Sequence, residues 1–424
     1  MTNVVVPFPQ VPDWKTGLTV NSKGIPLGNL RNVLHALRHA PEWHGVLAYD
    51  DFAACVITKK PPPWEGSKGP TVKRWADEHD VRACEWMQEQ DIPALGVVGR
   101  AIQSVARETR VHPVRDYLNA LKWDGTPRLD TWLTPYLGVK DTPYSRAVGP
   151  RFLISAVARI FEPGCQADHM LILEGPQGVL KSTALRALAG TAWFTDRMSN
   201  LGGKDAAMEV AGVWLIEMAE LDALTKASNS ATKAFVTRRN DRFRPPYGRH
   251  LVDQPRQCVF AGTINPNGGY LTDPTGARRF WPVTCGVIDR EALGCDRDQL
   301  WAEAVVRFRA DAPWWLETPA LEALATAEQE LRFEVDPWAE TVSGWLAGRN
   351  EVSVSEVLTG ALGVPVASQS HSAEMRIAAI LKSTGFEQYR PGKKGQPRTP
   401  RYRRDVVGEA RGDLRQKKFT KKST

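Results

Sequence analysis

The stretch GPQGVLKST, residues 175–183, combines two glycines, a lysine and two hydroxyl side chains within nine positions. It follows the apolar run MLILE and precedes a helix-forming run, so it predicts a loop between a buried strand and a helix N-terminus. Backbone N–H groups converge on an anion there, and a lysine and a hydroxyl can hold a phosphate chain and its metal ion. The chemistry indicated is the binding of ATP with Mg²⁺.

Each position in this loop has an expected role. Lys181 would reach the β- and γ-phosphates, Ser182 would bind Mg²⁺, and glycine at 175 and 178 would allow close approach of the backbone. Leu180 stands where the pattern G-x-x-x-x-G-K-[ST] has its second glycine. Its N–H can still donate, at a cost of about 1 kcal/mol if the position needs a positive φ. The residues expected to contact the nucleotide are Gly175, Pro176, Gln177, Gly178, Val179, Leu180, Lys181, Ser182 and Thr183.

Acidic residues follow a second apolar run, in GVWLIEMAELD. An ATPase needs one carboxylate beside Mg²⁺ and another that orients the attacking water. We assign Glu217 to the magnesium ion and Glu220 to the water, and the reverse assignment remains open.

An amide and two guanidinium groups lie further along the chain. Asn265 ends a third apolar run, CVFAGTIN, where its side chain could hydrogen-bond the attacking water or the γ-phosphate. Arg278 and Arg279 lie in a glycine turn, DPTGARRFWPV, where we expect both to be exposed and either to stabilise charge on the leaving phosphates. If that arginine came from a neighbouring subunit, hydrolysis would require a ring. An ion pair with Asp273 is the structural alternative.

Basic residues concentrate in two other segments. TRRNDRFRPPYGRHLVDQPRQC predicts a hairpin whose Arg244, Tyr247, Arg249 and His250 would suit a nucleic-acid backbone, with the tyrosine stacking on a base. A salt-bridged surface loop is the alternative. Residues 390–424 contain 13 Lys or Arg and 3 Asp or Glu, against a net charge of +7 for the whole chain. Such a tail attracts polyanions, or is a solvated, disordered end.

The elements that must position these groups predict an α/β fold. The runs MLILE, VWLIE and CVFAGTI are continuous, which is typical of parallel strands covered on both faces. Helical patterns occur at 27–40, 80–110 and 290–333, and a strand and turn at 45–57. Between 337 and 402, two or three short helices precede GFEQYRP and PRYRR, which could form a hairpin. Three helices with a hairpin are the composition of a winged helix.

Composition excludes several classes of protein. The 424 residues are 42% hydrophobic, enough for buried cores, and no apolar run has the length that spans a membrane. The six cysteines form no CxxC pair, which argues against a zinc site or a disulfide scaffold and favours a reducing, cytoplasmic setting. The N-terminal residues carry no visible export signal.

Five segments resemble the virulence-associated protein E family: HPVRDYLNALKWDGTPRLDTWL, AVARIFEPGCQADHMLILEGPQGVLKST, GGKDAAMEVAGVWLIEMAELD, FRPPYGR with PRQCVFAGTINP, and DPTGARRFWPV. The resemblance spans about residues 25–310. The family is found in phages and mobile elements and is similar to superfamily 3 helicases, hexameric AAA+ motors that travel along single-stranded DNA.

The resemblance implies ATP and Mg²⁺ at the loop, Glu217 and Glu220 as the acids, and Asn265 as first sensor. It implies Arg278 or Arg279 as a finger that acts on the neighbouring subunit's nucleotide. The hairpin before Asn265 would grip DNA in the central pore. Leu180 departs from the family's usual glycine, which puts turnover in question more than binding.

These expectations divide the chain into five regions. They are an α-rich collar or DNA-contacting domain at 1–140, a P-loop AAA+ core at 141–290, a helical extension at 291–335, a winged-helix-like domain at 336–405 and a basic tail at 406–424. The early acids Asp50 and Asp51 lack the spacing that two-metal nucleotidyl transfer favours, so primase activity is not expected at 1–140.

The function expected is ATP-dependent translocation or unwinding of DNA, as a homo-oligomeric, hexameric ring that replicates a phage or mobile element. Single-stranded DNA is the expected partner, with a primase or another replication protein as a further one, and no membrane. An initiator or helicase loader that binds origin duplex DNA, with ATP as a switch, is the alternative. A P-loop protein that acts outside replication is a third reading.

Overall fold

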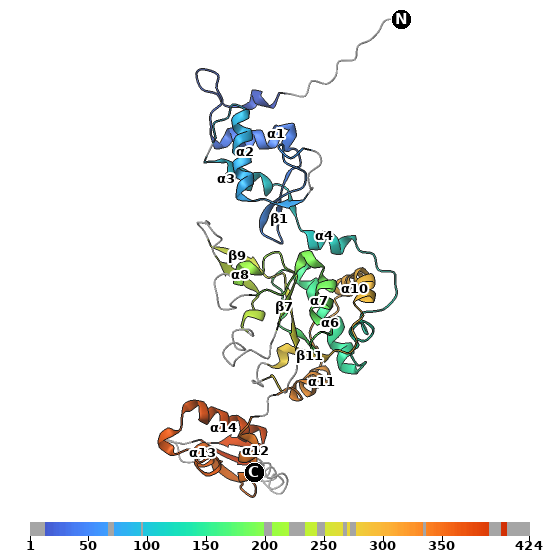
Figure 1. Cartoon of the computed structure of the whole chain (residues 1–424), viewed down its shortest axis with the longest axis vertical. Coiled ribbons are helices and arrows are strands. Elements are labelled where there is room, and N and C mark those ends of the chain that lie inside the picture. The colour runs from blue at the N-terminus through green and yellow to red at the C-terminus, as the bar shows by residue number, and fades with distance from the viewer. Residues whose placement is uncertain are drawn as a thin grey trace, which may run out of the picture. The chain divides into compact units, whose positions relative to one another are not determined.

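The computed structural model describes residues 13–66, 72–94, 96–198, 206–219, 234–243, 251–265, 269–271, 277–333, 336–389 and 400–404. The chain divides into two compact units, Met1–Phe333 and Glu334–Thr424 (Figure 1). Among the described helices, none combines the length and the apolar character that a membrane crossing requires.

The first part of the larger unit is a small mixed sheet with helices. Strands β1 and β2 form the expected strand and turn, and the sheet has the order β3-β2-β1-β4. The helical stretch expected at 80–110 is two helices, because Pro93 lies between them and cannot continue a helix. The elements are α1 (Leu30–His39), β1 (Leu47–Asp50), β2 (Cys55–Thr58), β3 (Lys73–Arg74), α2 (Asp77–Glu89), α3 (Val98–Ala106) and β4 (Arg110–Val111), with 3₁₀ turns at Trp14–Gly17 and Pro41–Trp43.

The second part of this unit is a five-stranded parallel sheet in the order β11-β5-β10-β7-β6, which confirms the expected α/β fold. Every residue of β5 and β10 is buried, as their continuous apolar runs predict. Because β10 lies between β5 and β7, the carboxyl ends of these three strands meet at one edge. The strands are β5 (Met170–Glu174), β6 (Phe194–Thr195), β7 (Leu215–Met218), β10 (Val259–Ile264) and β11 (Phe280–Thr284).

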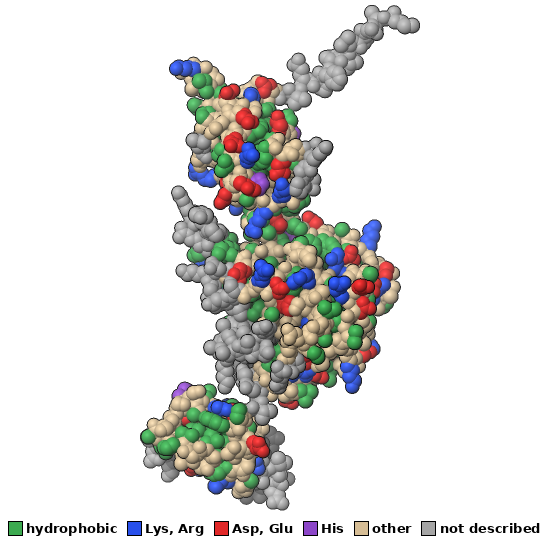
Figure 2. Space-filling model, in the orientation of Figure 1, with side chains coloured by type: hydrophobic (Ala, Val, Ile, Leu, Met, Phe, Trp, Pro, Cys, Tyr) green, Lys and Arg blue, Asp and Glu red, His purple; other side chains and the backbone are tan. Residues whose placement is uncertain are grey.

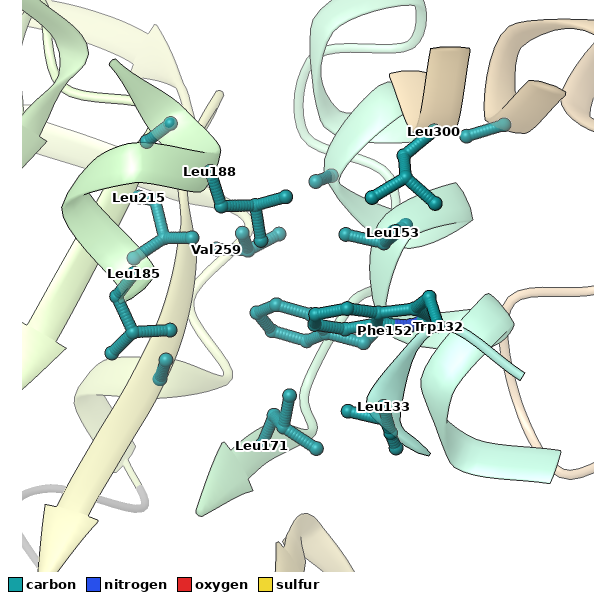
Figure 3. Close-up of a cluster of buried hydrophobic side chains, with 14 of the residues drawn as sticks. Trp132, Leu133, Phe152, Leu153, Leu171, Leu185, Leu188, Leu215, Val259 and Leu300 are labelled. Atoms are coloured by element: carbon teal, nitrogen blue, oxygen red, sulfur yellow. The ribbon is translucent and has the colours of Figure 1, made fainter. Parts of the chain in front are cut away.

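Helices cover this sheet, with α6 at the centre of the core. Helix α6 is buried along nearly its whole length and contacts α10 as well as β5 and β10. Figure 3 shows the rings of Trp132 and Phe152 among leucine side chains of α7 and the strands. The helices are α4 (Pro113–Ala120), α5 (Leu133–Leu137), α6 (Pro143–Phe161), α7 (Lys181–Ala189), α8 (Ala206–Glu209), α10 (Arg290–Arg309) and α11 (Pro319–Glu330), with 3₁₀ turns at Thr191–Trp193 and Ala277–Arg279.

A two-stranded hairpin separates β7 from β10 in the chain. Its strands, β8 (Asn240–Phe243) and β9 (Val252–Pro255), pair in antiparallel register, so the stem of the expected hairpin is present. The tip, with Arg244, Tyr247, Arg249 and His250, lies outside the described residues.

The smaller unit packs three helices against a three-stranded antiparallel sheet of order β12-β14-β13. The expected hairpin is present as β13 and β14, and β12 adds a strand that sequence analysis did not identify. Leu358, Leu381 and Phe386 belong to its own hydrophobic core. The elements are α12 (Ala339–Trp345), β12 (Glu351–Ser353), α13 (Val354–Leu362), α14 (His371–Ser383), β13 (Phe386–Tyr389) and β14 (Arg401–Arg404), with a 3₁₀ turn at Val366–Ser368.

Charged side chains of both signs are interspersed over the face of the larger unit drawn in Figure 2. Among the described residues of that face, no broad field of one sign is visible.

Candidate nucleotide-binding site

The loop of residues 175–180 joins a fully buried strand to a helix N-terminus. Strand β5 ends at Glu174 and α7 begins at Lys181. Gly178 has a φ of +87°, a backbone conformation that L side chains rarely adopt. The unpaired N–H groups of the first turn of α7 and the helix dipole make this end attractive to an anion.

Leu180 has a left-handed backbone, with φ +71° and ψ +24°, at the position where the sequence pattern has glycine. The position therefore does require a positive φ, and the leucine carries a conformational cost of about 1 kcal/mol. Its side chain is 49% exposed, so burial offsets little of that cost. The loop thus holds the geometry that glycine usually supplies, with a strained residue in its place.

The ammonium group of Lys181 is held inside the loop. Its Nζ donates to the carbonyl oxygens of Gly175 and Pro176, at 2.6 and 2.9 Å, and to Oδ1 of Asn265 at 2.9 Å. Burial lowers the pKa of Lys181 from its ordinary value. Asn265 directly follows β10, the neighbour of β5, so the sheet brings the amide to the lysine.

A buried carboxylate lies next to the loop. Oε1 of Glu217 accepts hydrogen bonds from the hydroxyls of Ser182 and Thr263, each at 2.6 Å. The side chain of Glu217 is almost wholly buried, and within the described part of the chain its Oε2 has no hydrogen-bond partner. A buried carboxylate oxygen without a donor is costly unless a cation or another donor satisfies it.

These oxygens fit a magnesium ion. Mg²⁺ takes oxygen ligands and is usually bound by one or two side chains together with phosphate oxygens and water. The Ser182 hydroxyl and the unpartnered Oε2 of Glu217 are ligands of that kind, side by side.

A cavity of about 330 Å³ opens beside these groups. This volume lies in the range of small-molecule pockets, about 300–1,000 Å³. Its walls come from the loop of residues 175–180, which we call the phosphate loop after its predicted role, from α7 and from the carboxyl ends of β7 and β10. They consist of Gln177, Gly178, Val179, Leu180, Lys181, Ser182, Thr183, Ala219, Thr263, Ile264 and Asn265.

Most residues predicted to contact the nucleotide line this cavity, and the carbonyls of Gly175 and Pro176 hold Lys181. Glu220 lies outside the described residues. Sequence analysis did not identify Thr263. Its signal was the spacing, because a residue two positions before Asn265 on an extended chain points to the same face.

Arg278 and Arg279 lie at the opposite end of the sheet, where its parallel strands begin. They precede β11, which runs parallel to β5 with Phe280 opposite Met170 and Thr284 opposite Glu174. Five residues of strand span about 13 Å, so these arginines do not reach their own phosphate loop. The expectation that both are exposed is wrong for Arg279, which is half-buried where it lines a cavity with Trp281; Arg278 is exposed.

The stem of the hairpin is fixed by a buried ion pair. Arg256 binds both carboxylate oxygens of Asp241, at 2.8 and 2.5 Å, and both side chains are almost wholly buried. Arg256 also donates to the carbonyl of Phe235 and lies over its ring. Removing either partner alone would leave a buried charge unpaired, which is strongly destabilising.

A second buried carboxylate anchors the strand that enters the loop. Both oxygens of Glu174 accept from Arg332, at 2.7 and 2.8 Å, and the hydroxyls of Tyr270 and Thr284 donate to the same carboxylate. Burial opposes the charged form, but these hydrogen bonds and the arginine charge outweigh it and lower the pKa of Glu174. The network ties the base of the phosphate loop to the end of α11.

Comparisons with known proteins agree with the motifs. Residues 118–334 match the family model of the virulence-associated protein E-like domain. Solved structures of the NrS-1 C-terminal region in its apo form are similar at 12% identity, with 84% of this chain and 95% of that region covered and TM-scores of 0.43 to 0.45. No curated protein matches the sequence. Since the family model spans just over half of the chain, the chain belongs to the virulence-associated protein E-like family.

Proposed function

We propose that this protein is a Mg²⁺-dependent ATPase that drives movement along single-stranded DNA in the replication of a phage or mobile element. One observation carries the proposal. Lys181, Glu217 and Asn265, from three separate segments, converge at the edge where β5, β7 and β10 end.

In this proposal the backbone N–H groups of the loop and Nζ of Lys181 hold the triphosphate. Lys181 exchanges its loop carbonyls for phosphate oxygens when ATP binds. Ser182 and Glu217 would hold Mg²⁺, which would neutralise charge on the phosphates. Asn265 is within reach of Lys181 and hydrogen-bonds the γ-phosphate or the attacking water.

The contacts of Glu217 favour a role as magnesium ligand over a role in orienting the attacking water. Its Oε1 accepts a hydrogen bond from Ser182, the other residue expected to bind Mg²⁺, so the carboxylate lies directly beside that hydroxyl. We therefore assign the orientation of water to Glu220, three residues later in the chain.

The place of Arg278 and Arg279 supports a ring. Since they lie at the end of the sheet away from their own loop, they do not reach the nucleotide proposed there, and could act on the nucleotide of another copy. Arg278 is the better candidate, because it is exposed and Arg279 is not. A head-to-tail interface of this kind closes into a ring when the rotation between copies allows it. We propose a homohexamer with an AAA+ core, in which the hairpin of β8 and β9 holds the DNA.

A second candidate function has its own support. The order of elements in the smaller unit is α12-β12-α13-α14-β13-β14, with β14 central, which supports a winged helix, a module that commonly binds duplex DNA. An initiator or loader that binds origin DNA, with ATP as its switch, would use this unit.

Two assays separate these functions. A translocase hydrolyses ATP continuously, single-stranded DNA raises the rate, and a labelled strand is displaced from a partial duplex. An initiator binds duplex DNA through residues 336–404 with sequence preference and displaces no strand. If no nucleic acid changes the rate of ATP hydrolysis, and the chain neither displaces a strand nor binds duplex DNA, the remaining function is that of an ATPase that acts outside replication.

A further inference from the structure

A second cavity, of about 690 Å³, lies at the sheet edge opposite the phosphate loop. Its walls come from the segment before β5, the turn before β11, the segment after α10 and helix α11. The volume is that of a small-molecule pocket. The residues proposed to hold ATP and Mg²⁺ in this chain do not line this cavity, whereas Arg278, proposed to act on another copy's nucleotide, does.

Two tryptophans form one wall of this cavity, and the chain that carries them is clamped. The indole N–H of Trp314 donates to the carbonyl of Gln166 at 2.8 Å. Arg151 donates to the carbonyl of Trp315 at 2.9 Å and pairs with Glu317. The ring of Trp315, which meets that of Trp314 edge to face, is 52% exposed. An exposed indole on a fixed backbone is preorganised to stack on a flat ligand.

Polar groups without partners form the opposite wall. His169 stacks on Trp281, with ring centroids 3.8 Å apart, and is almost wholly buried. Across the described residues, Nε2 of His169 and the buried Nε of Arg279 have no hydrogen-bond partner. Buried polar atoms are nearly always paired, so two orphans on one cavity wall indicate a ligand that supplies the partners.

The charged groups on the walls define the ligand further. Arg278 and Arg279 offer guanidinium donors for an anion, and Asp168 and Glu322 offer carboxylate acceptors for amino or imino groups. A ligand that meets all of these is flat and nitrogen-rich, has N–H donors and ring acceptors, and carries an anionic group. A nucleotide unit, a base with its phosphate, has these features together.

We propose that this cavity is a second nucleotide site, in which the base stacks on Trp315 and is read by His169 while Arg279 takes the phosphate. The unit could be a free mononucleotide or one residue of single-stranded DNA, which share this chemistry. The proposal does not require that the chain hydrolyse ATP.

The test uses the full chain with Lys181→Ala, which silences the phosphate loop. Deoxyadenosine monophosphate is titrated by calorimetry, and a fluorescein-labelled oligo(dT) by anisotropy. Trp315→Ala removes the stacking ring at an exposed position. His169→Phe keeps a ring against Trp281 and deletes only the nitrogens. Val287→Ala, an exposed apolar residue outside the cavity, is the matched control.

We expect Trp315→Ala to weaken binding of one probe about tenfold or more, since stacking of one base contributes that much. We expect His169→Phe to weaken binding of the same probe to a similar extent of about tenfold, since it removes the nitrogen that pairs with the base. Val287→Ala should have no effect. If the monophosphate shows this dependence, the ligand is a free nucleotide; if only the oligonucleotide does, it is a DNA residue. The proposal is overturned if neither probe binds, or if both variants bind both probes as the Lys181→Ala parent does. Thermal melting of each variant checks that it is folded.

Discussion

Nζ of Lys181 and Oδ1 of Asn265 lie 2.9 Å apart, although 84 positions separate them in the chain. The contact exists because β10 pairs with β5 in parallel, so that both strands deliver their next residues to the same edge. Lys181, which we propose to bind the phosphates of ATP, is therefore hydrogen-bonded to Asn265, which we propose to sense the γ-phosphate. In the proposed function, a third phosphate would be sensed at the end of β10 through this contact.

Replacing Lys181 with alanine should reduce the affinity for Mg-ATP at least about tenfold, because a charge-assisted hydrogen bond to phosphate contributes roughly 1.5–3 kcal/mol. Calorimetric titration with a non-hydrolysable ATP analogue measures this. Lys122→Ala, which removes an exposed lysine, should bind as the wild type does. Equal affinities in the two variants would mean that Lys181 does not contact the phosphates.

Glu217→Gln should keep nucleotide binding and lower hydrolysis by about a hundredfold or more, since the metal loses its charged ligand. The Mg²⁺ concentration needed for half-maximal activity should rise with it. Glu330→Gln, at the exposed end of α11, is the control for the loss of one carboxylate. Wild-type magnesium dependence in Glu217→Gln would remove Glu217 from the metal site.

Substitution of Leu180 by glycine should be tolerated, whereas substitution by isoleucine should destabilise the protein. Glycine adopts φ near +71° without strain, whereas a β-branched residue there is more strained than leucine, so Leu180→Ile should lower the free energy of unfolding by about 1 kcal/mol. Urea unfolding measures the difference. Leu180→Gly should keep ATP affinity within about threefold, since the N–H donor stays. Equal stability of the two variants would show that the loop does not hold a positive φ in solution.

Arg278→Ala should bind ATP and fail to hydrolyse it. If the site is shared between copies, mixing Arg278→Ala with Lys181→Ala should restore activity, since each variant supplies what the other lacks. Random mixing in a ring would complete about a quarter of the sites. Arg290→Ala, another exposed arginine, should be fully active. No recovery on mixing, in a preparation that assembles, would contradict a trans-acting Arg278.

Stability should fall on acidification because of His169. Burial lowers the pKa of His169 to about 3 from an ordinary 6.5; Asp168 opposes the shift and Arg159 adds to it. Between these values the unfolded chain binds a proton that the folded chain does not, so the stabilisation present above pH 6.5 is lost as the pH falls. The loss is about 1.4 kcal/mol per pH unit, or about 2 kcal/mol from pH 6.5 to 5.

His169→Phe should remove that part of the pH dependence and keep the stacked ring. Urea unfolding at pH 7.5 and pH 5 compares the two chains. An unchanged difference between the two pH values in His169→Phe would mean that His169 is protonated in the folded protein or is not buried.

The sequence predicted the features that depend on residues close together in the chain. The loop between a buried strand and a helix at residues 175–180, the buried strands MLILE and CVFAGTI, and the stem of the basic hairpin could be predicted because apolar runs and glycine spacing are local properties. The side chains that contact Glu217 could not be predicted in this way, because Thr263 reaches Glu217 only through the pairing of β10 with β7. The same holds for Glu174 and Arg332, which are 158 positions apart.

Long-range packing also explains the error at Arg279. A glycine turn predicts exposure, but the turn is followed by a strand whose Trp281 is buried against His169, and this draws the arginine into a cavity wall. Exposure in a turn depends on what packs against the turn, which a local pattern does not contain.

Whether the chain is a DNA-stimulated ATPase is decided by its steady-state rate of ATP hydrolysis, measured with Mg²⁺ and with or without single-stranded DNA. We expect hydrolysis that requires Mg²⁺, rises severalfold with the DNA and is lost in Lys181→Ala. Hydrolysis that Lys181→Ala retains in full, or none at all from a folded chain supplied with Mg-ATP and DNA, would contradict the proposed function.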